Sequence, residues 1–71
     1  MFLGFIFICA LGVQECTRSN AIQVVQIPGT FTNAVSQGLA GAACQNAAVG
    51  YARSHFDPKI NRIGVNCELQ P

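Results

Sequence analysis

The sequence predicts an α+β fold in which an N-terminal apolar helix, acting as signal or anchor, precedes a short strand, one Ala/Gly-rich helix and a short C-terminal strand. Three observations predict this order: an unbroken apolar run at the N-terminus, a long uncharged segment rich in alanine and glycine, and alternating apolar and polar residues near the C-terminus. Helical spacing of apolar residues indicates a helix, and strict alternation indicates a half-buried strand.

The composition is that of a small, weakly charged chain. With 71 residues it forms at most one domain, to which we assign residues 14–71. A domain of this size buries too little surface to be stable without disulfides, a partner or a membrane. Hydrophobic residues make up 51% of the chain, charged residues only 10%, and the net charge is +1. This balance favours membrane, interface or exported proteins and argues against nucleic-acid binding.

The apolar run extends from Met1 to Val13. A helix needs about 20 residues to span a bilayer, whereas the core of a signal peptide has about 7 to 15. The tripeptide Ala10-Leu11-Gly12 offers small residues at the spacing that a signal peptidase reads, with cleavage before Val13, but no lysine or arginine precedes the run. A cleaved signal, an uncleaved membrane anchor and a buried core helix therefore remain open for this segment.

A polar exit and a short strand are predicted next. Glu15 and Arg18 lie three residues apart, close enough on a helix to pair weakly. Residues 21–27, AIQVVQI, are rich in β-branched side chains and end at Pro28-Gly29, which indicates a strand closed by a turn. If residues 1–14 form an anchor, its helix could instead continue until Pro28 stops it.

The Ala/Gly-rich helix is predicted over Thr30 to Arg53. Thr30 or Thr32 can cap it, because a threonine oxygen accepts hydrogen bonds from the free N–H groups of the first turn. Each internal glycine costs the helix about 1 kcal/mol relative to alanine, so tight packing must compensate.

Two unlike faces run along this helix. One carries large side chains, with Phe31, Val35, Leu39 and Val49 on one side at about 100° per residue. The other is nearly flat, and we predict that it is a packing surface, because small residues let another helix approach closely. Its partner could be residues 1–14 or a second copy, and the alternative is a simple core helix of a small globule. The flat face consists of Ala34, Gly38, Gly41, Ala48 and Ala52.

The C-terminal segment is predicted to end the helix and form a strand. The residue before Pro58 avoids helical geometry, so the helix ends within residues 53–59. We assign Arg53, Lys59 and Arg62 to the charged surface. Apolar residues then alternate with polar or small ones over residues 62–69, which indicates a half-buried strand. Together with residues 21–27 it would form a two-stranded sheet covered on one side.

Cysteines occur at positions 9, 16, 44 and 67, without the C-x-x-C spacing of zinc or thioredoxin-like sites. In a short exported chain they indicate disulfides. Removal of residues 1–12 would leave Cys16, Cys44 and Cys67, which allow three pairings and leave one thiol unpaired or bonded to a partner. Among these pairings we favour Cys16–Cys67, with Cys44 buried in the helix.

No catalytic, cofactor-binding or metal-binding residues are predicted. Ser54, His55 and Asp57 have the side chains of a catalytic triad, but triads are assembled from separate segments, since sequence neighbours cannot easily orient toward one another. No glycine-rich phosphate loop follows a strand. We therefore expect a protein without enzymatic activity and without a cofactor.

Two short motifs carry a family resemblance. Residues 12–18, GVQECTR, follow the apolar run, and residues 32–40, TNAVSQGLA, open the Ala/Gly-rich segment. The first resembles the G-x-x-E-x-x-R at the anchor exit of TadE-like minor pilins, and the second is similar to the helix that follows in that family. The resemblance covers residues 1–53. It implies a membrane-anchored accessory subunit of a tight-adherence pilus that acts by helix packing.

The leading hypothesis is a non-enzymatic subunit, anchored in the cell envelope or exported, that acts by helix packing in an assembly such as a pilus. A protein partner or self-association is expected, with membrane contact through Met1 to Val13 if that segment is retained. The alternative is a secreted, disulfide-stabilised peptide that binds a target through residues 53–62. A third possibility is an orphan or truncated reading frame with no stable fold alone.

Overall fold

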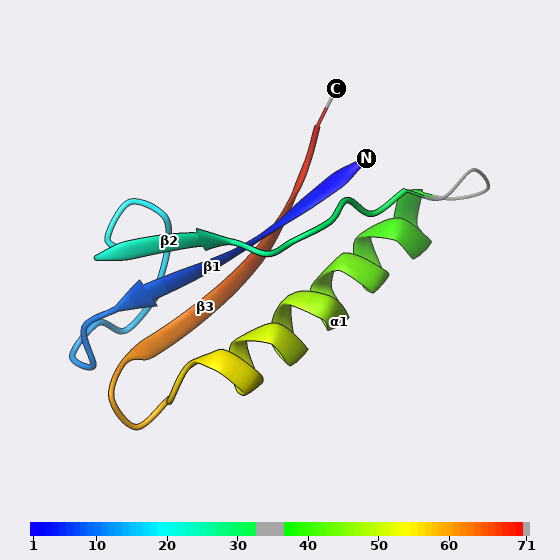
Figure 1. Cartoon of the computed structure of the whole chain (residues 1–71). Helices are drawn as coiled ribbons and strands as arrows, with labels where there is room; N and C mark the ends of the chain where they lie inside the picture. Colours follow the sequence, from blue (N-terminus) through cyan, green and yellow to red (C-terminus); the bar gives the residue numbers. More distant parts are fainter. Residues whose placement is uncertain (33–36, 71) are drawn as a thin grey trace.

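A computed structural model describes residues 1–32 and 37–70, which form a three-stranded antiparallel sheet with one helix on one face (Figure 1). The strands are β1 (Phe2–Cys9), β2 (Gln23–Gln26) and β3 (Arg62–Leu69), and the helix is α1 (Gln37–His55). The strand order is β2-β1-β3, so the strand nearest the N-terminus lies at the centre of the sheet.

The apolar N-terminal run forms β1, so the predicted N-terminal apolar helix is wrong. β1 pairs with β3 along its whole length, from Phe2 opposite Leu69 to Cys9 opposite Arg62, and its second half also pairs with β2. A strand covered on both faces has a continuous apolar sequence, which a short buried helix shares. Phenylalanine and isoleucine favour the strand. Of the helices in the described part of the chain, none combines the length and hydrophobicity needed to cross a membrane.

The central helix begins at Gln37, seven residues after the predicted Thr30. The N–H of Phe2 donates to the carbonyl of Phe31 at 2.8 Å, and the N–H of Phe31 donates back at 3.0 Å. Thr30 and Thr32 therefore flank a residue paired with β1 and do not cap α1. At the other end, α1 stops at His55, two residues beyond the predicted Arg53. The helix thus ends before Pro58, as expected.

The two predicted strands are present as β2 and β3. Hydrogen bonds continue the β1–β2 ladder past both ends of β2. The N–H of Ile22 donates to the carbonyl of Ile8 at 2.7 Å, and the N–H of Ile27 donates to the carbonyl of Gly4 at 3.0 Å. The predicted two-stranded sheet thus gains a third strand, because the segment assigned to a helix inserts between the other two.

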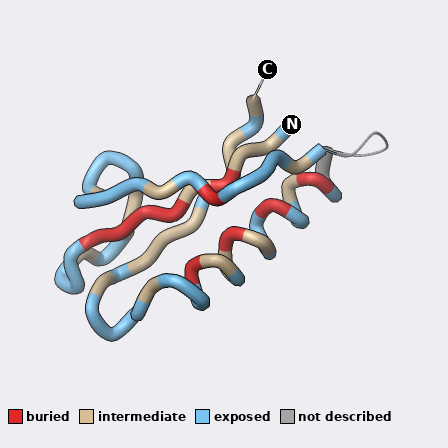
Figure 2. The backbone as a smooth tube through the Cα atoms, in the orientation of Figure 1, coloured by how far each residue is buried: buried red, intermediate tan, exposed pale blue. Residues whose placement is uncertain are grey.

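The core lies between α1 and the sheet, where Figure 2 shows one buried stripe of α1 facing the buried β1. Ile6 and Ile8 point toward the helix and belong to the core cluster. Small side chains bring the helix close to the strands, so that a Cβ at Gly4 would lie 3.2 Å from Sγ of Cys44 on α1. The buried stripe of α1 consists of Ala40, Cys44, Ala48 and Ala52.

The loop between β1 and β2 covers the opposite face of the sheet. The guanidinium carbon of Arg18 lies 4.7 Å from the ring centre of Phe5 and 5.5 Å from that of Phe7. Arg18 also forms an ion pair with Glu68 of β3 at 2.5 Å. β1 is therefore covered at both its odd and even positions, which is why its sequence is apolar throughout.

Two disulfides, Cys9–Cys16 and Cys44–Cys67, connect these layers. The chain is thus a small, disulfide-stabilised domain, as the cysteine content indicates. The favoured Cys16–Cys67 pairing is wrong, because Cys67 faces α1 and Cys16 lies over the other face of the sheet, beside Gly64. Cys44 is buried as expected, but it is bonded to Cys67.

Candidate protein-binding surface

An apolar hollow of about 260 Å³ lies between the C-terminal half of α1 and β3. Val65 and Ile63 line it from β3, so it opens beside the outer edge of the sheet. The helix and the connection that follows it supply the rest of the wall. These lining residues include Val49, Arg53, Phe56 and Pro58.

A second hollow of about 280 Å³ adjoins the first, since both are lined by Pro58 and Ile63. Leu11, Asn61 and Arg62 complete its lining. Leu11 is 57% exposed, so the β1–β2 loop contributes a large apolar side chain to this side of the molecule.

The connection between the hollows is held by local hydrogen bonds. The carboxylate of Asp57 accepts the N–H of Lys59 at 2.8 Å, and its backbone carbonyl accepts the N–H of Ile60 at 3.1 Å. Aspartate followed by proline is typical of a turn, because the side chain caps the backbone and proline presets its own φ angle. The turn presents Ile60 to solvent with 67% of its surface exposed.

The three predicted surface charges surround these hollows. Arg53 lines the first hollow, Arg62 lines the second, and Lys59 lies in the turn between them. All three are exposed, and the nearest acidic residue in sequence is Asp57. An apolar hollow bordered by cations, beside a second hollow of mixed polar and apolar lining, suits a protein segment that carries apolar and acidic side chains.

The outer edge of β3 completes this side of the molecule. In the described residues β3 pairs with β1 alone. The N–H of Gln70 donates to the carbonyl of Met1 at 2.8 Å, so these two residues form a hydrogen-bonded pair. In an antiparallel ladder every second pair along the strand is hydrogen-bonded. The even-numbered residues of β3 therefore bond to β1. The backbone groups of Ile63, Val65, Cys67 and Leu69 point to the open edge, and such an edge is a template for another strand.

We call the two hollows, their three cations and the open edge of β3 the α1–β3 surface. The charged residues were predicted, whereas the hollows and the edge were not. The alternation in residues 62–69 indicated a strand, but no signal in the sequence showed that β3 would lie at an edge.

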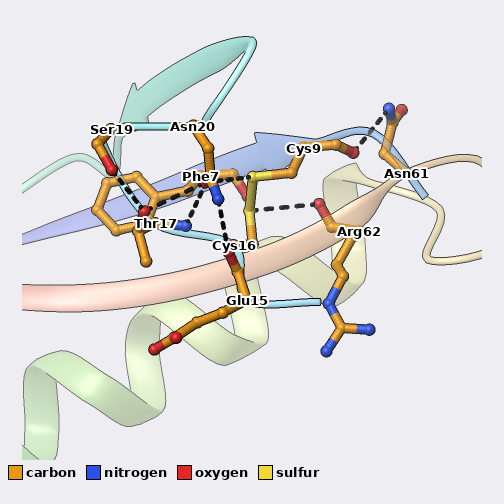
Figure 3. The surroundings of a disulfide bond; sticks show 9 residues. All are labelled: Phe7, Cys9, Glu15, Cys16, Thr17, Ser19, Asn20, Asn61 and Arg62. Carbon is orange, nitrogen blue, oxygen red and sulfur yellow. Dashed lines mark hydrogen bonds between the residues drawn. A yellow bond between two sulfur atoms is a disulfide. The ribbon is translucent and has the colours of Figure 1, made fainter. Parts of the chain in front are cut away.

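Polar contacts fix the loop on the other face of the sheet around the Cys9–Cys16 disulfide (Figure 3). Asn20 is central: its Nδ2 donates to the carbonyl of Glu15 at 2.7 Å, and its Oδ1 accepts the N–H of Thr17 at 2.8 Å. Nδ2 of Asn61 donates to the carbonyl of Cys9 at 3.3 Å. The hollow of about 330 Å³ beside this loop is lined by Arg18 and Glu68, which already pair with each other. These contacts hold the loop against β1 and β3.

The flat helix face contacts the sheet of its own chain at its described positions. Ala48 and Ala52 are buried in the core cluster, and a Cβ at Gly41 would lie 3.4 Å from the ring of Phe2. Ala34 and the packing of Gly38 lie outside the described part of the structure. The bulky stripe does not face the core as a unit, since Leu39 is 59% exposed and Val49 lines the first hollow.

The triad-like residues have other contacts. The ring of His55 stacks on Tyr51 with a centroid separation of 4.0 Å, and the carboxylate of Asp57 caps the turn. Over residues 1–32 and 37–70 no group of three histidine, cysteine or acidic side chains could hold a metal ion. The absence of enzymatic activity and of a cofactor stays a prediction, as does the resemblance to TadE-like minor pilins. Comparisons of the chain with protein-family models, with curated proteins and with solved structures found no match.

Proposed function

We propose that the protein is an exported, non-enzymatic subunit that binds another protein through the α1–β3 surface. One observation carries the proposal: an apolar hollow opens directly beside an edge of β3 with which no strand of the described residues pairs, and Ile63 and Val65 belong to both. Partners that add a strand gain main-chain hydrogen bonds at such an edge and specificity from neighbouring side-chain pockets.

The disulfides support a location in the cell envelope or outside the cell. Disulfides persist in oxidising compartments and are rare where cellular thiols are kept reduced. Two of them in a chain of 71 residues supply stability that a core of this size does not. A tight-adherence pilus, which the resemblance implies, would be one such assembly. The contacts would then involve the α1–β3 surface, because residues 2–9 form a strand.

The proposal also unites the two functional hypotheses drawn from the sequence. Arg53 and Arg62 bound the segment assigned to target binding, and both line the hollows. A role in assembly needs a surface that another chain can cover, and the α1–β3 surface meets this need as well.

Site-specific photo-crosslinking tests this function. A benzophenone amino acid is placed at Phe56, which lines the first hollow, or at Ile22, which is 70% exposed on the β2 side. Each full-length variant is produced in its native cells and irradiated, and the adducts are identified by mass spectrometry. We expect a discrete protein adduct from position 56 and none from position 22. Equal labelling at both positions, or none at either, would refute the proposed surface.

A further inference from the structure

We propose that the partner at the α1–β3 surface is a second copy of this chain, whose β3 pairs with the first β3 antiparallel across a two-fold axis at Val65. The inference rests on the proposed function and names the partner. It is carried by the self-complementary arrangement of backbone groups, charges and apolar side chains along β3.

The backbone of β3 fits this pairing. The outward groups belong to Ile63, Val65, Cys67 and Leu69, because the alternate residues bond to β1. With Val65 opposite its own copy, Ile63 lies opposite Cys67 of the second copy, and both pairs exchange hydrogen bonds. The strand contains no proline or lysine, the residues that commonly protect a strand edge from pairing.

The charges select this register. With the axis at Val65, Arg62 of each copy lies opposite Glu68 of the other, in a pair that is not hydrogen-bonded through the backbone, where cross-strand side chains are closest. Moving the register by two residues in either direction places Arg62 opposite Asn66 or Gln70 instead. Glu68 already pairs with Arg18 on the same face of the sheet, and its side chain keeps 32% of its surface exposed. A second arginine can therefore reach it.

The apolar side chains lie on the opposite face, where the helices are. Ile63 and Val65 face α1, which packs on both β1 and β3. Strands lie about 4.8 Å apart, so a helix over β1 and β3 would lie roughly 10 Å from its two-fold mate, close to the distance at which helices pack. The helices would then cover the apolar hollow beside β3 from both sides. Pairing thus extends the sheet to six strands and buries half-exposed apolar surface.

Sedimentation equilibrium on the full-length oxidised protein tests the pairing. We expect a concentration-dependent monomer–dimer equilibrium. Arg62→Glu and Glu68→Arg should each weaken self-association by about tenfold or more, because each change turns two attractive cross-strand pairs into like-charge pairs. An equimolar mixture of the two variants should associate again, because one edge then carries two acidic and the other two basic side chains. Gln23→Glu adds a charge at an exposed position of β2, on the opposite edge of the sheet, and should leave association unchanged.

Amide hydrogen exchange gives a second measurement in the same molecule. The N–H groups of Val65 and Cys67 should become protected as concentration rises, whereas those of Val24 and Gln26, which point outward at the β2 edge, should not. A chain that stays monomeric, or variants that fail to associate when mixed although each is folded, would overturn the inference. If the probe at Phe56 then captures a different protein, the proposed function stands without self-pairing. If the probe at Phe56 captures no protein, both the proposed function and the self-pairing are refuted.

Discussion

At the scale of single residues, two glycines mark where separate layers approach each other most closely. Gly4 of β1 lies under Ile27 and Cys44, and Gly64 of β3 lies under the backbone of Cys16. A Cβ at Gly64 would come 2.7 Å from the carbonyl oxygen of Cys16, whose position is fixed by its disulfide to Cys9. These glycines are needed for contact between segments distant in sequence.

Replacement of Gly64 tests this contact. Gly64→Ala should destabilise the protein by about 1–3 kcal/mol, because the new methyl group collides with a backbone atom that cannot rotate away. The matched control is Gly50→Ala, where the new Cβ meets no atom within 4 Å apart from its chain neighbours and the local backbone of the helix. It should stabilise the protein by up to about 1 kcal/mol, because alanine is the better helix former. Urea denaturation measures both changes, and equal effects at the two sites would contradict the proposed contact.

At the scale of elements, α1 packs through its smallest side chains. Ala40, Cys44, Ala48 and Ala52 recur every four residues and are buried, while Leu39 is exposed. Large side chains on the sheet, such as Ile6 and Ile8, fill the space that small helix residues leave. The helix therefore lies close to β1 and β3.

Enlarging this stripe should separate the two layers. Ala48→Leu adds three carbons at a fully buried position and should cost about 1–3 kcal/mol of folding stability. Ala43→Leu makes the same change on the exposed side of α1 and should alter stability by less than about 0.5 kcal/mol. Thermal unfolding followed by circular dichroism distinguishes them, and a stable Ala48→Leu variant would show that the face is not tightly packed.

The two disulfides join different elements and should differ in their contributions to stability. Cys44–Cys67 ties α1 to β3 across a sequence separation of 23, whereas Cys9–Cys16 closes a separation of 7. The chain-entropy model gives roughly 3.4 kcal/mol for the first and 2.4 kcal/mol for the second. Each pair of cysteines is replaced with alanine, and the denaturation midpoints of the two variants are compared. The comparison shows which disulfide contributes more to stability. A larger loss from the Cys9–Cys16 pair would contradict it.

At the scale of the whole molecule, β1 organises the fold. It pairs with both other strands, packs against α1 on one face and lies under the Arg18 loop on the other. The strand nearest the N-terminus is thus the element that every other element contacts.

Removal of residues 1–12, as cleavage before Val13 would do, should therefore abolish the fold. Without β1, β2 and β3 have no strand between them, and Cys16 loses its partner Cys9. We expect residues 13–71 alone to show a reactive thiol and no cooperative thermal transition. The full-length chain should show no free thiol and one transition. A cooperative transition in the shortened chain would mean that β1 is dispensable.

The sequence by itself determined the short strands, the Ala/Gly-rich helix and the presence of disulfides. Alternation over residues 62–69, β-branched residues at 21–27 and the long uncharged segment rich in alanine and glycine are local signals that predicted these elements correctly. The predicted start of the helix was overridden, because Phe31 pairs with Phe2 of β1. The three cations of the candidate surface were also visible. Their position around two hollows depends on how α1 crosses β3, which no local pattern records.

Only the tertiary structure decided that residues 2–9 form a strand, which cysteines pair, and which strand edge stays open. The hydrophobic pattern of an apolar run of this length is consistent with a buried helix and with a central strand, because burial on both faces removes the alternation that separates them. The disulfide pairing follows from which sheet face each cysteine occupies: Cys67 faces α1, and Cys16 lies over the other face. The arrangement of the strands sets the disulfide pairing and the open edge. It arises from contacts between residues far apart in the chain.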